Sequence, residues 1–285
     1  MSDSTESSRE VCCTVNLENC HEHHDGCSEH GHEVHVHVHV HHHCCRAAPV
    51  KPDTLPIIRI GYSGLIAIGV PSYPNLLTQI KAPSNYGPKG TYNKIQSVEF
   101  ADATADLGSS SLTVTQLRDK YDLLSIGLHG VAVVEAVRLK EYVDLGGAVI
   151  LACDHSPTPS VINVLQQFGH TGDFSKSITG AYSGVSSTTE NLSSYFGSST
   201  GVPLKGQSGI TITAAQLPSG SRVFATYGAN VLCWSVGGMQ DRVFGLADIE
   251  LTVADVAGTG VETVQEKFLH NLIARIFDQV LKVSK

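Results

Sequence analysis

The sequence predicts an α/β fold with a doubly wound, mostly parallel sheet and an antiparallel edge, preceded by a low-complexity segment. Two observations predict the sheet. From Leu55 onward, short apolar runs alternate with amphipathic runs, and turns that contain glycine separate them. A third observation sets the first segment apart, because residues 1–45 contain six of the eight cysteines and eleven of the fifteen histidines.

The first half of this alternation predicts four strands and three helices. Right-handed crossovers between such strands produce a parallel sheet. We expect strands at 55–64, 94–102, 121–130 and 148–154, and helices at 114–120, 131–145 and 161–168. The helix at 131–145 is expected to have an apolar face, to which Val133, Val134, Val137, Leu139, Tyr142 and Val143 contribute.

The second half of the domain has weaker signals. Residues 171–209 are rich in serine, threonine and glycine, and we expect loops there around one short helix at 189–196. Three closely spaced strands follow, at 221–227, 229–236 and 241–248, and their spacing predicts a hairpin-like antiparallel edge. A long helix at 260–283 ends the domain.

The composition changes abruptly near residue 46, where two prolines follow. We therefore divide the chain into a histidine- and cysteine-rich arm at 1–46, a linker at 47–54 and an α/β domain at 55–285. Residues 1–45 carry eight acids and one base, whereas the rest of the chain is nearly neutral. A nearly neutral domain gives no reason to expect nucleic acid as a partner, and its GYSG and GLHG turns match no nucleotide-binding fingerprint.

Neither a secretory signal nor a membrane span is expected. The first ten residues are polar and acidic, and apolar stretches such as 148–152 are far too short to cross a bilayer. We therefore expect a cytoplasmic protein with reduced thiols.

The arm is dense in side chains that bind metal ions. In an extended segment, alternate side chains share a face about 6.8 Å apart, so the four histidines from His35 to His41 would line one face. Imidazole and thiolate ligands suit zinc, nickel or copper. No CxxC pair or zinc-finger spacing defines a single site. The candidate ligands are His21, His23, His24, Cys27, His35, His37, His39, His41, His43, Cys44 and Cys45.

Three interpretations of the arm stay open. It is a low-complexity tract with incidental metal affinity, a segment for metal storage, buffering or sensing, or an edge strand that pairs with another copy of itself. Its adjacent cysteine pairs, Cys12-Cys13 and Cys44-Cys45, could support intermolecular disulfides in an oxidising compartment. The second interpretation implies a transition-metal cofactor, and the third implies self-association or a protein partner that binds through the arm.

Four polar residues follow two neighbouring predicted strands. His129 lies at the carboxyl end of the third strand, where the chain enters a loop at 127–130, and Cys153, Asp154 and His155 lie at the carboxyl end of the fourth. Carboxyl ends of parallel strands line the edge where α/β sheets bind ligands, so these residues could form a metal or acid–base group. The alternative is structural: Asp154 caps a turn, Cys153 is a small buried residue, and the histidines are solvated. Asp248 ends the last strand and either lines the same edge or caps a turn, whereas Cys233 and Trp234 are expected in the core.

The order of the elements resembles the class I glutamine amidotransferase-like (GATase-like) fold, specifically its non-catalytic branch. The resemblance covers about residues 56–283 and is carried by KYDLLSIGLHG, KEYVDLGGAVILACD, SVINVLQQFG, and GGMQDRVFGLAD with FLHNLIARIF. Active members place a nucleophilic cysteine on a glycine-flanked strand-to-helix elbow, and Cys153 lies at the comparable strand end. The positions two residues away on either side hold Leu151 and His155 instead of glycine, and the family's His-x-Glu partner is missing. His270, on the final helix, suits packing or solvent.

Three functions are compatible with these features. The leading one is a non-enzymatic GATase-like binding or scaffold domain that carries a metal-binding arm. The second is a cysteine-dependent hydrolase or amidotransferase-like enzyme centred on Cys153, with His129 or His155 as the base. The third is a structural subunit that assembles through its arm.

Overall fold

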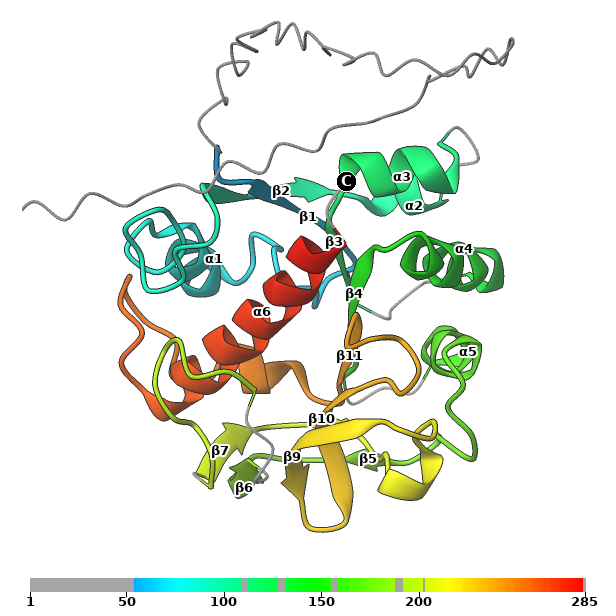
Figure 1. Ribbon diagram of the computed structural model, residues 1–285. Coiled ribbons are helices and arrows are strands. Elements are labelled where there is room, and N and C mark those ends of the chain that lie inside the picture. The colour runs from blue at the N-terminus through cyan, green and yellow to red at the C-terminus, as the bar shows by residue number, and fades with distance from the viewer. Residues whose placement is uncertain are drawn as a thin grey trace, which may run out of the picture. The chain divides into compact units, whose positions relative to one another are not determined.

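The computed structural model describes residues 54–283, apart from 109–111, 128–131, 155–157, 188–191 and 202. These residues belong to one unit, which runs from Lys51 to Lys285. A nine-stranded mixed sheet forms its centre, and helices cover both faces (Figure 1). Helices α1 (Pro74–Lys81) and α6 (Val264–Lys282) lie on one face, and α2 (Thr104–Gly108), α3 (Val114–Lys120), α4 (Val133–Asp144) and α5 (Pro159–Gln167) lie on the other. The predicted doubly wound α/β fold is confirmed.

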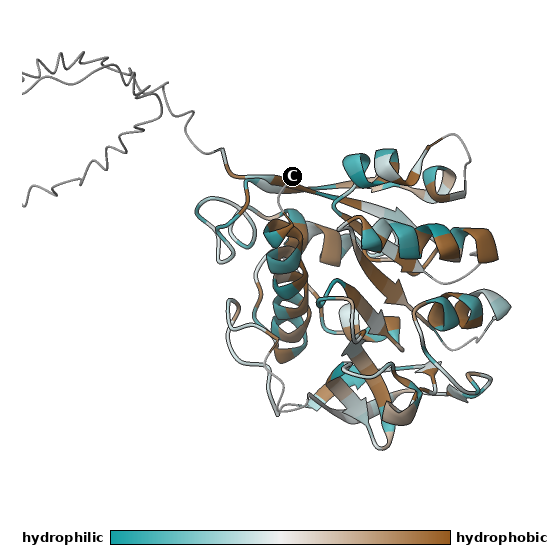
Figure 2. Cartoon of the chain, turned by 45° about the vertical axis from the view of Figure 1, so that its right-hand side comes forward, coloured by the Kyte–Doolittle hydropathy of each residue, from teal (hydrophilic) through white to brown (hydrophobic). Residues whose placement is uncertain are grey.

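Five parallel strands form one half of the sheet, in the order β2-β1-β3-β4-β11. They span Ile57–Ser63 (β1), Ser97–Asp102 (β2), Leu123–Gly127 (β3), Ala148–Ala152 (β4) and Val243–Leu246 (β11). Every residue of β3 and β4 is buried, which explains why their sequences are apolar apart from Ser125, whose hydroxyl oxygen accepts the N–H of Ile68. Figure 2 shows the same concentration of apolar residues on the central strands.

Four antiparallel strands continue the sheet beyond β11, in the order β10-β9-β6-β7. They span Tyr182–Ser187 (β6), Pro203–Gly206 (β7), Arg222–Tyr227 (β9) and Asn230–Ser235 (β10). The predicted antiparallel edge is confirmed for β9 and β10. The third strand predicted there, β11, is antiparallel to β10 as expected, but it also pairs in parallel with β4, so it lies inside the sheet and all four of its residues are buried.

The loop prediction for residues 171–209 is wrong. This segment contains β6, β7 and a separate two-stranded sheet of β5 (Ser177–Ile178) and β8 (Gly209–Ile210). The described part of the helix expected at 189–196, residues 192–196, is not helical. β6 is held by hydrogen bonds to β7 and β9. Its serine- and glycine-rich sequence lacks the alternation of apolar residues that predicts a strand, so it was not recognised.

The helices start and end within a few residues of their predicted ranges, except that α1 and α2 were not predicted. α3 occupies its predicted range because Thr113 and Gln116 form a capping box at its start. The sheet-facing half of α4 also matches, with Leu139, Tyr142 and Val143 buried. The prediction is wrong for Val133, Val134 and Val137, which are 60%, 66% and 38% exposed because they lie on the opposite side of the helix.

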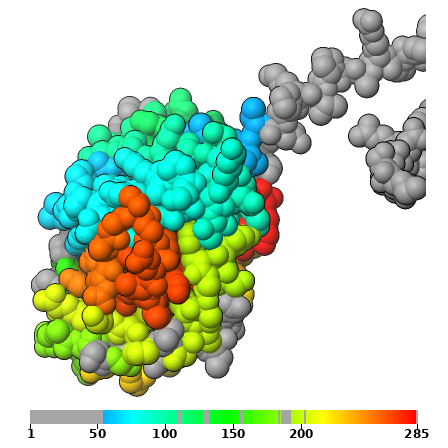
Figure 3. Space-filling model, turned by 90° about the vertical axis from the view of Figure 1, so that its left-hand side faces the viewer, coloured from blue at the N-terminus to red at the C-terminus, as the bar shows by residue number. Residues whose placement is uncertain are grey.

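The segment before α6 is hydrogen-bonded to α1. Gln79 donates from its Nε2 to the carbonyl oxygens of Ala257 and Gly260, at 2.9 and 2.7 Å. Figure 3 shows this segment, in orange, directly below the α1 region, in cyan. No helix in the part of the chain that the structure describes is long and apolar enough to cross a membrane.

Candidate functional site

The carboxyl ends of β1, β3, β4 and β11 meet at one edge of the sheet, where ligands of α/β proteins usually bind. Of the four candidates at this edge, Cys153 and Asp154 follow β4 directly. His129 and His155 lie outside the described residues. The candidate metal ligands between His21 and Cys45 also lie outside them, and no cluster of three or more metal-binding side chains occurs among residues 54–283 where these are described.

Cys153 is completely buried in the hydrophobic core. Its backbone N–H donates to the carbonyl of Leu246 at 2.8 Å, which continues the pairing of β4 with β11. Burial raises the pKa of the Cys153 thiol well above its ordinary value, and the negative charge of Asp154 raises it further. A thiol in this environment stays protonated at neutral pH, which disfavours a nucleophilic role.

Asp248 stands at the end of β11 and is fully buried. Its carboxylate caps the short 3₁₀ helix η2 (Ile249–Thr252) by accepting the N–H of Glu250 at 2.8 Å. It also accepts the N–H of Gln207 at 3.0 Å and the hydroxyl of Tyr182. Both roles expected for Asp248 therefore apply, since it caps a turn and lines this edge.

A glycine makes this arrangement possible. A Cβ atom at position 206 would lie 2.4 Å from Oδ2 of Asp248 and 2.3 Å from the hydroxyl oxygen of Tyr182. Only glycine therefore lets β7 pass close to the carboxylate.

Glu250 is the member of this edge that the sequence did not single out. Burial raises the pKa of its carboxyl well above the ordinary range, and the hydrogen bond to Asp248 and the charges of Asp248 and Asp154 raise it further. A carboxyl with its pKa raised to about 8 is largely protonated at neutral pH, so Glu250 is mainly in its neutral form. The Oε2 atom of Glu250 is buried without a hydrogen-bond partner.

Tyr73, which precedes α1, lines a small cavity and lies within electrostatic range of Glu250 and Asp154. Burial and the charges of Glu250 and Asp154 raise the pKa of Tyr73. The cavity has a volume of about 180 Å³ and lies between Tyr73, Asn75, Val253 and Val256. Asp248 accepts hydrogen bonds from two backbone N–H groups and the Tyr182 hydroxyl, so its carboxylate holds η2 and β7 in place.

The two described histidines belong to the core. His170 donates from Nδ1 to the carbonyl of Leu165, and its Nε2 accepts from Nε1 of Trp234, both at 2.9 Å. His270 accepts from the hydroxyl of Tyr86 at 2.9 Å and donates to Oε1 of Gln79 at 2.8 Å. Burial lowers the pKa of each imidazole to about 4, so both stay neutral. The core placement predicted for Trp234 and Cys233 is confirmed.

Comparison with known proteins gives only distant likenesses. No family model matches the chain, and no curated protein matches it. A protein from Bacteroides uniformis that is described as ThuA-like is 11% identical, with a TM-score of 0.46 over 81% of this chain and 94% of that one. A cytoplasmic protein from Salmonella typhimurium is 12% identical, with a TM-score of 0.45 over 79% of this chain and 98% of that one.

A third likeness is to the N-terminal domain of mmIFT52, at 11% identity and a TM-score of 0.42 over 70% of this chain and 89% of that domain. All three TM-scores are below 0.5, so none of these likenesses supports an argument about family or function. The fold class rests on the observed strand order.

Proposed function

We propose that this protein binds a transition metal ion through the arm at 1–46 and that its α/β domain is a non-enzymatic, GATase-like binding or scaffold domain. The observation that carries the proposal is the density of ligands in the arm, which holds eleven histidines and six cysteines within 45 residues. Zinc, nickel or copper is the expected ion, because each accepts imidazole and thiolate ligands.

Metal binding would order the arm, since the free energy of ligation offsets the conformational entropy lost on fixing the segment. The ordered arm would then dock on a protein partner or on a second copy of the chain. A reducing cytoplasm would keep the thiols available as ligands.

The burial of Cys153 supports the non-enzymatic part of the proposal. A cysteine-dependent hydrolase needs a thiolate that substrate can reach, whereas this thiol is fully buried and has a raised pKa. An enzyme centred on Cys153 is therefore the less favoured alternative.

Two variants with alternating substitutions test the metal site. In the first, His35, His37, His39 and His41 are replaced together by serine. In the matched control, Val34, Val36, Val38 and Val40 are replaced by serine in the same segment. We expect titration of the full chain with zinc to show loss of the tightest binding in the histidine variant and retention of it in the valine variant. Equal zinc stoichiometry and affinity in both variants would overturn the assignment of the ligands.

A further inference from the structure

A pocket of about 270 Å³ opens at the amino edge of the sheet, opposite the carboxyl ends. It lies between the start of β1, the end of α3 and the end of α6, and Figures 1 and 2 show the last turn of α6 beside the start of β1. Its walls are largely apolar and include Ile57, Ile58, Val280 and Val283. Two arginines, Arg59 and Arg118, and the carboxylate of Asp122 also line it.

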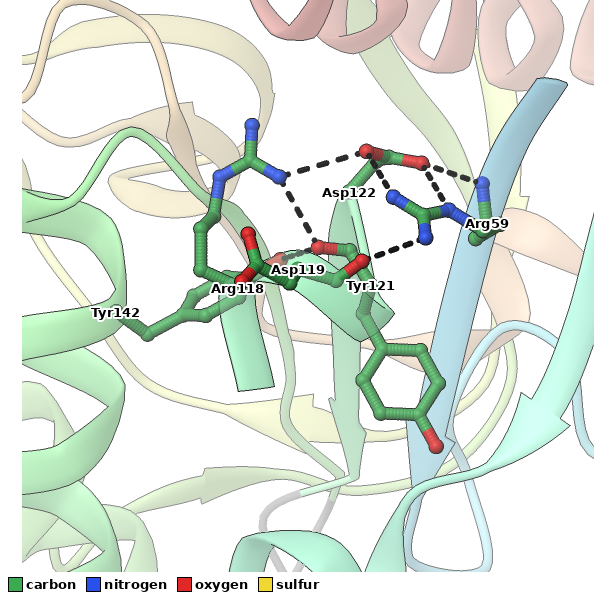
Figure 4. Close-up of polar contacts among 6 residues, drawn as sticks. All are labelled: Arg59, Arg118, Asp119, Tyr121, Asp122 and Tyr142. Atoms are coloured by element: carbon green, nitrogen blue, oxygen red, sulfur yellow. Dashed lines mark hydrogen bonds and ion pairs between the residues drawn. The ribbon is translucent and has the colours of Figure 1, made fainter. Parts of the chain in front are cut away.

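Arg59 is the main hydrogen-bonding partner of the Asp122 carboxylate (Figure 4). The Nε and Nη2 atoms of Arg59 donate to the two carboxylate oxygens of Asp122, each at 3.1 Å. The backbone N–H of Arg59 donates to the same carboxylate at 2.9 Å, and Nη1 donates to the carbonyl of Asp119. The charge and the donors of Arg59 are therefore largely satisfied within the protein.

Arg118 is less well satisfied. Only 9% of its side chain is exposed, and its Nη1 makes one contact of 3.2 Å to the carbonyl of Tyr121 and one of 3.4 Å to Asp122. Its Nε is buried without a hydrogen-bond partner. Figure 4 shows Nη2 turned away from both acceptors. A buried guanidinium with unused donors is an unfavourable arrangement that an anion would relieve.

A third arginine, Arg242, lies close to the same pocket. A Cβ atom at Gly146 would touch both Val283, which lines the pocket, and Nη1 of Arg242. The Nε of Arg242 is also buried without a partner, and burial, with a contribution from the charge of Arg118, lowers the pKa of Arg242. Asp144, whose charge acts on Arg242, is 57% exposed and forms an ion pair with Lys140. Three arginines therefore lie at or beside the pocket, against one buried carboxylate, that of Asp122.

We propose that this pocket binds a small carboxylate with an apolar tail, whose charged group contacts Arg118 and whose tail packs against Ile57, Val280 and Val283. Unused arginine donors select the carboxylate, because charge-assisted hydrogen bonds are stronger than neutral ones. The apolar walls select the tail, since burial of hydrocarbon is favourable. This site is independent of the metal-binding arm, because none of its residues lies at 1–46.

Calorimetric titration of the full chain with octanoate tests the proposal. A chelator is present throughout, so that no metal ion on the arm can bind the carboxylate. We expect one saturable site for octanoate. The affinity for octanol, which lacks the charge, and for acetate, which lacks the tail, should be lower than that for octanoate by roughly tenfold or more. Octanol or acetate that binds as tightly as octanoate would overturn the proposal, as would octanoate without saturation at millimolar concentration.

Two variants locate the site. Arg118→Met is expected to weaken octanoate roughly tenfold or more and to leave octanol unchanged. Arg138→Met is the matched control, because Arg138 also has a buried, unpartnered Nε but does not line the pocket, and it should bind octanoate normally. If Arg118→Met does not fold, Ile57→Glu replaces it, since Ile57 is 42% exposed and a carboxylate there should repel octanoate. Unchanged octanoate affinity in the folded variant would contradict the proposal.

Discussion

The arm and the α/β domain contain the same chemically versatile residues in opposite settings. The domain places His170, His270, Cys153 and Cys233 in its core, where burial shifts every one of their pKa values toward the neutral form. The arm holds the other six cysteines and most of the histidines in a sequence without the large apolar residues that form a core. The comparison teaches that histidine and cysteine indicate a metal site only where folding does not use them for packing.

Acid unfolding gives the largest expected effect. The folded pKa of His170 and of His270 is about 4, below the ordinary value of 6.5. Between these values the unfolded chain binds protons that the folded chain does not. The two histidines therefore lower the free energy of unfolding as the pH falls from 6.5 toward 4, by about 3 kcal/mol each, whereas Glu250, with its pKa raised to about 8, opposes this loss between pH 8 and 4.5. Urea unfolding at a series of pH values measures this loss.

The control for acid unfolding is the double variant His170→Gln with His270→Gln. It should lose the contribution of the histidines between pH 6.5 and 5, a range in which Glu266, with a pKa of about 2, does not titrate, and it should keep the opposite contribution of Glu250. The arm histidines should not contribute to the pH dependence of the free energy of unfolding where their pKa values are the same in the folded and the unfolded protein. An unchanged slope in the double variant would show that other groups cause it.

His270→Ala tests one core histidine alone. The change leaves the Tyr86 hydroxyl and the Gln79 amide without their partner and opens a cavity beside the rings of Tyr86 and Phe196. We expect a loss of about 3 kcal/mol in the free energy of unfolding. His35→Ala in the arm should change it by less than about 0.5 kcal/mol. Similar losses in both variants would contradict the contrast between the two regions.

Thiol labelling gives the smallest but sharpest contrast. After chelation and removal of reductant, the six arm cysteines should react with iodoacetamide, because metal ligands must be reachable from solvent. Cys153 and Cys233 should react only on unfolding, since both are fully buried with raised thiol pKa values. Peptide mass spectrometry resolves the sites. Rapid labelling of Cys153 but not Cys233 in the folded protein would revive the enzymatic alternative.

The fold was predictable where local sequence decides structure. The apolar runs of β3 and β4 and the capping box of α3 depend on neighbouring residues, so their positions are close to those expected. The antiparallel pairing of β11 with β10 was predictable from their close spacing, whereas the parallel pairing of β11 with β4, about a hundred residues away, was not. Helix α1 was missed because its sequence, with Pro71 and Pro74, is typical of a turn.

The site was predictable only in part. The sequence placed Cys153, Asp154 and Asp248 at the carboxyl edge, since each ends a recognisable strand. It did not identify Glu250 or Tyr182. Glu250 could have been identified, because it follows Asp248 by two residues just after a strand. Tyr182 could not, since no local sequence pattern indicates that it contacts Asp248. The arginine pocket was missed because β1, α3 and α6 form it together.

Metal content is the measurement that tests the central claim most directly. Untagged full-length protein and a second protein of residues 47–285 are purified in parallel and analysed by elemental mass spectrometry. The account predicts zinc, nickel or copper in the full-length protein and none in residues 47–285. Metal retained at equal stoichiometry by residues 47–285 would contradict it and would direct attention to the α/β domain.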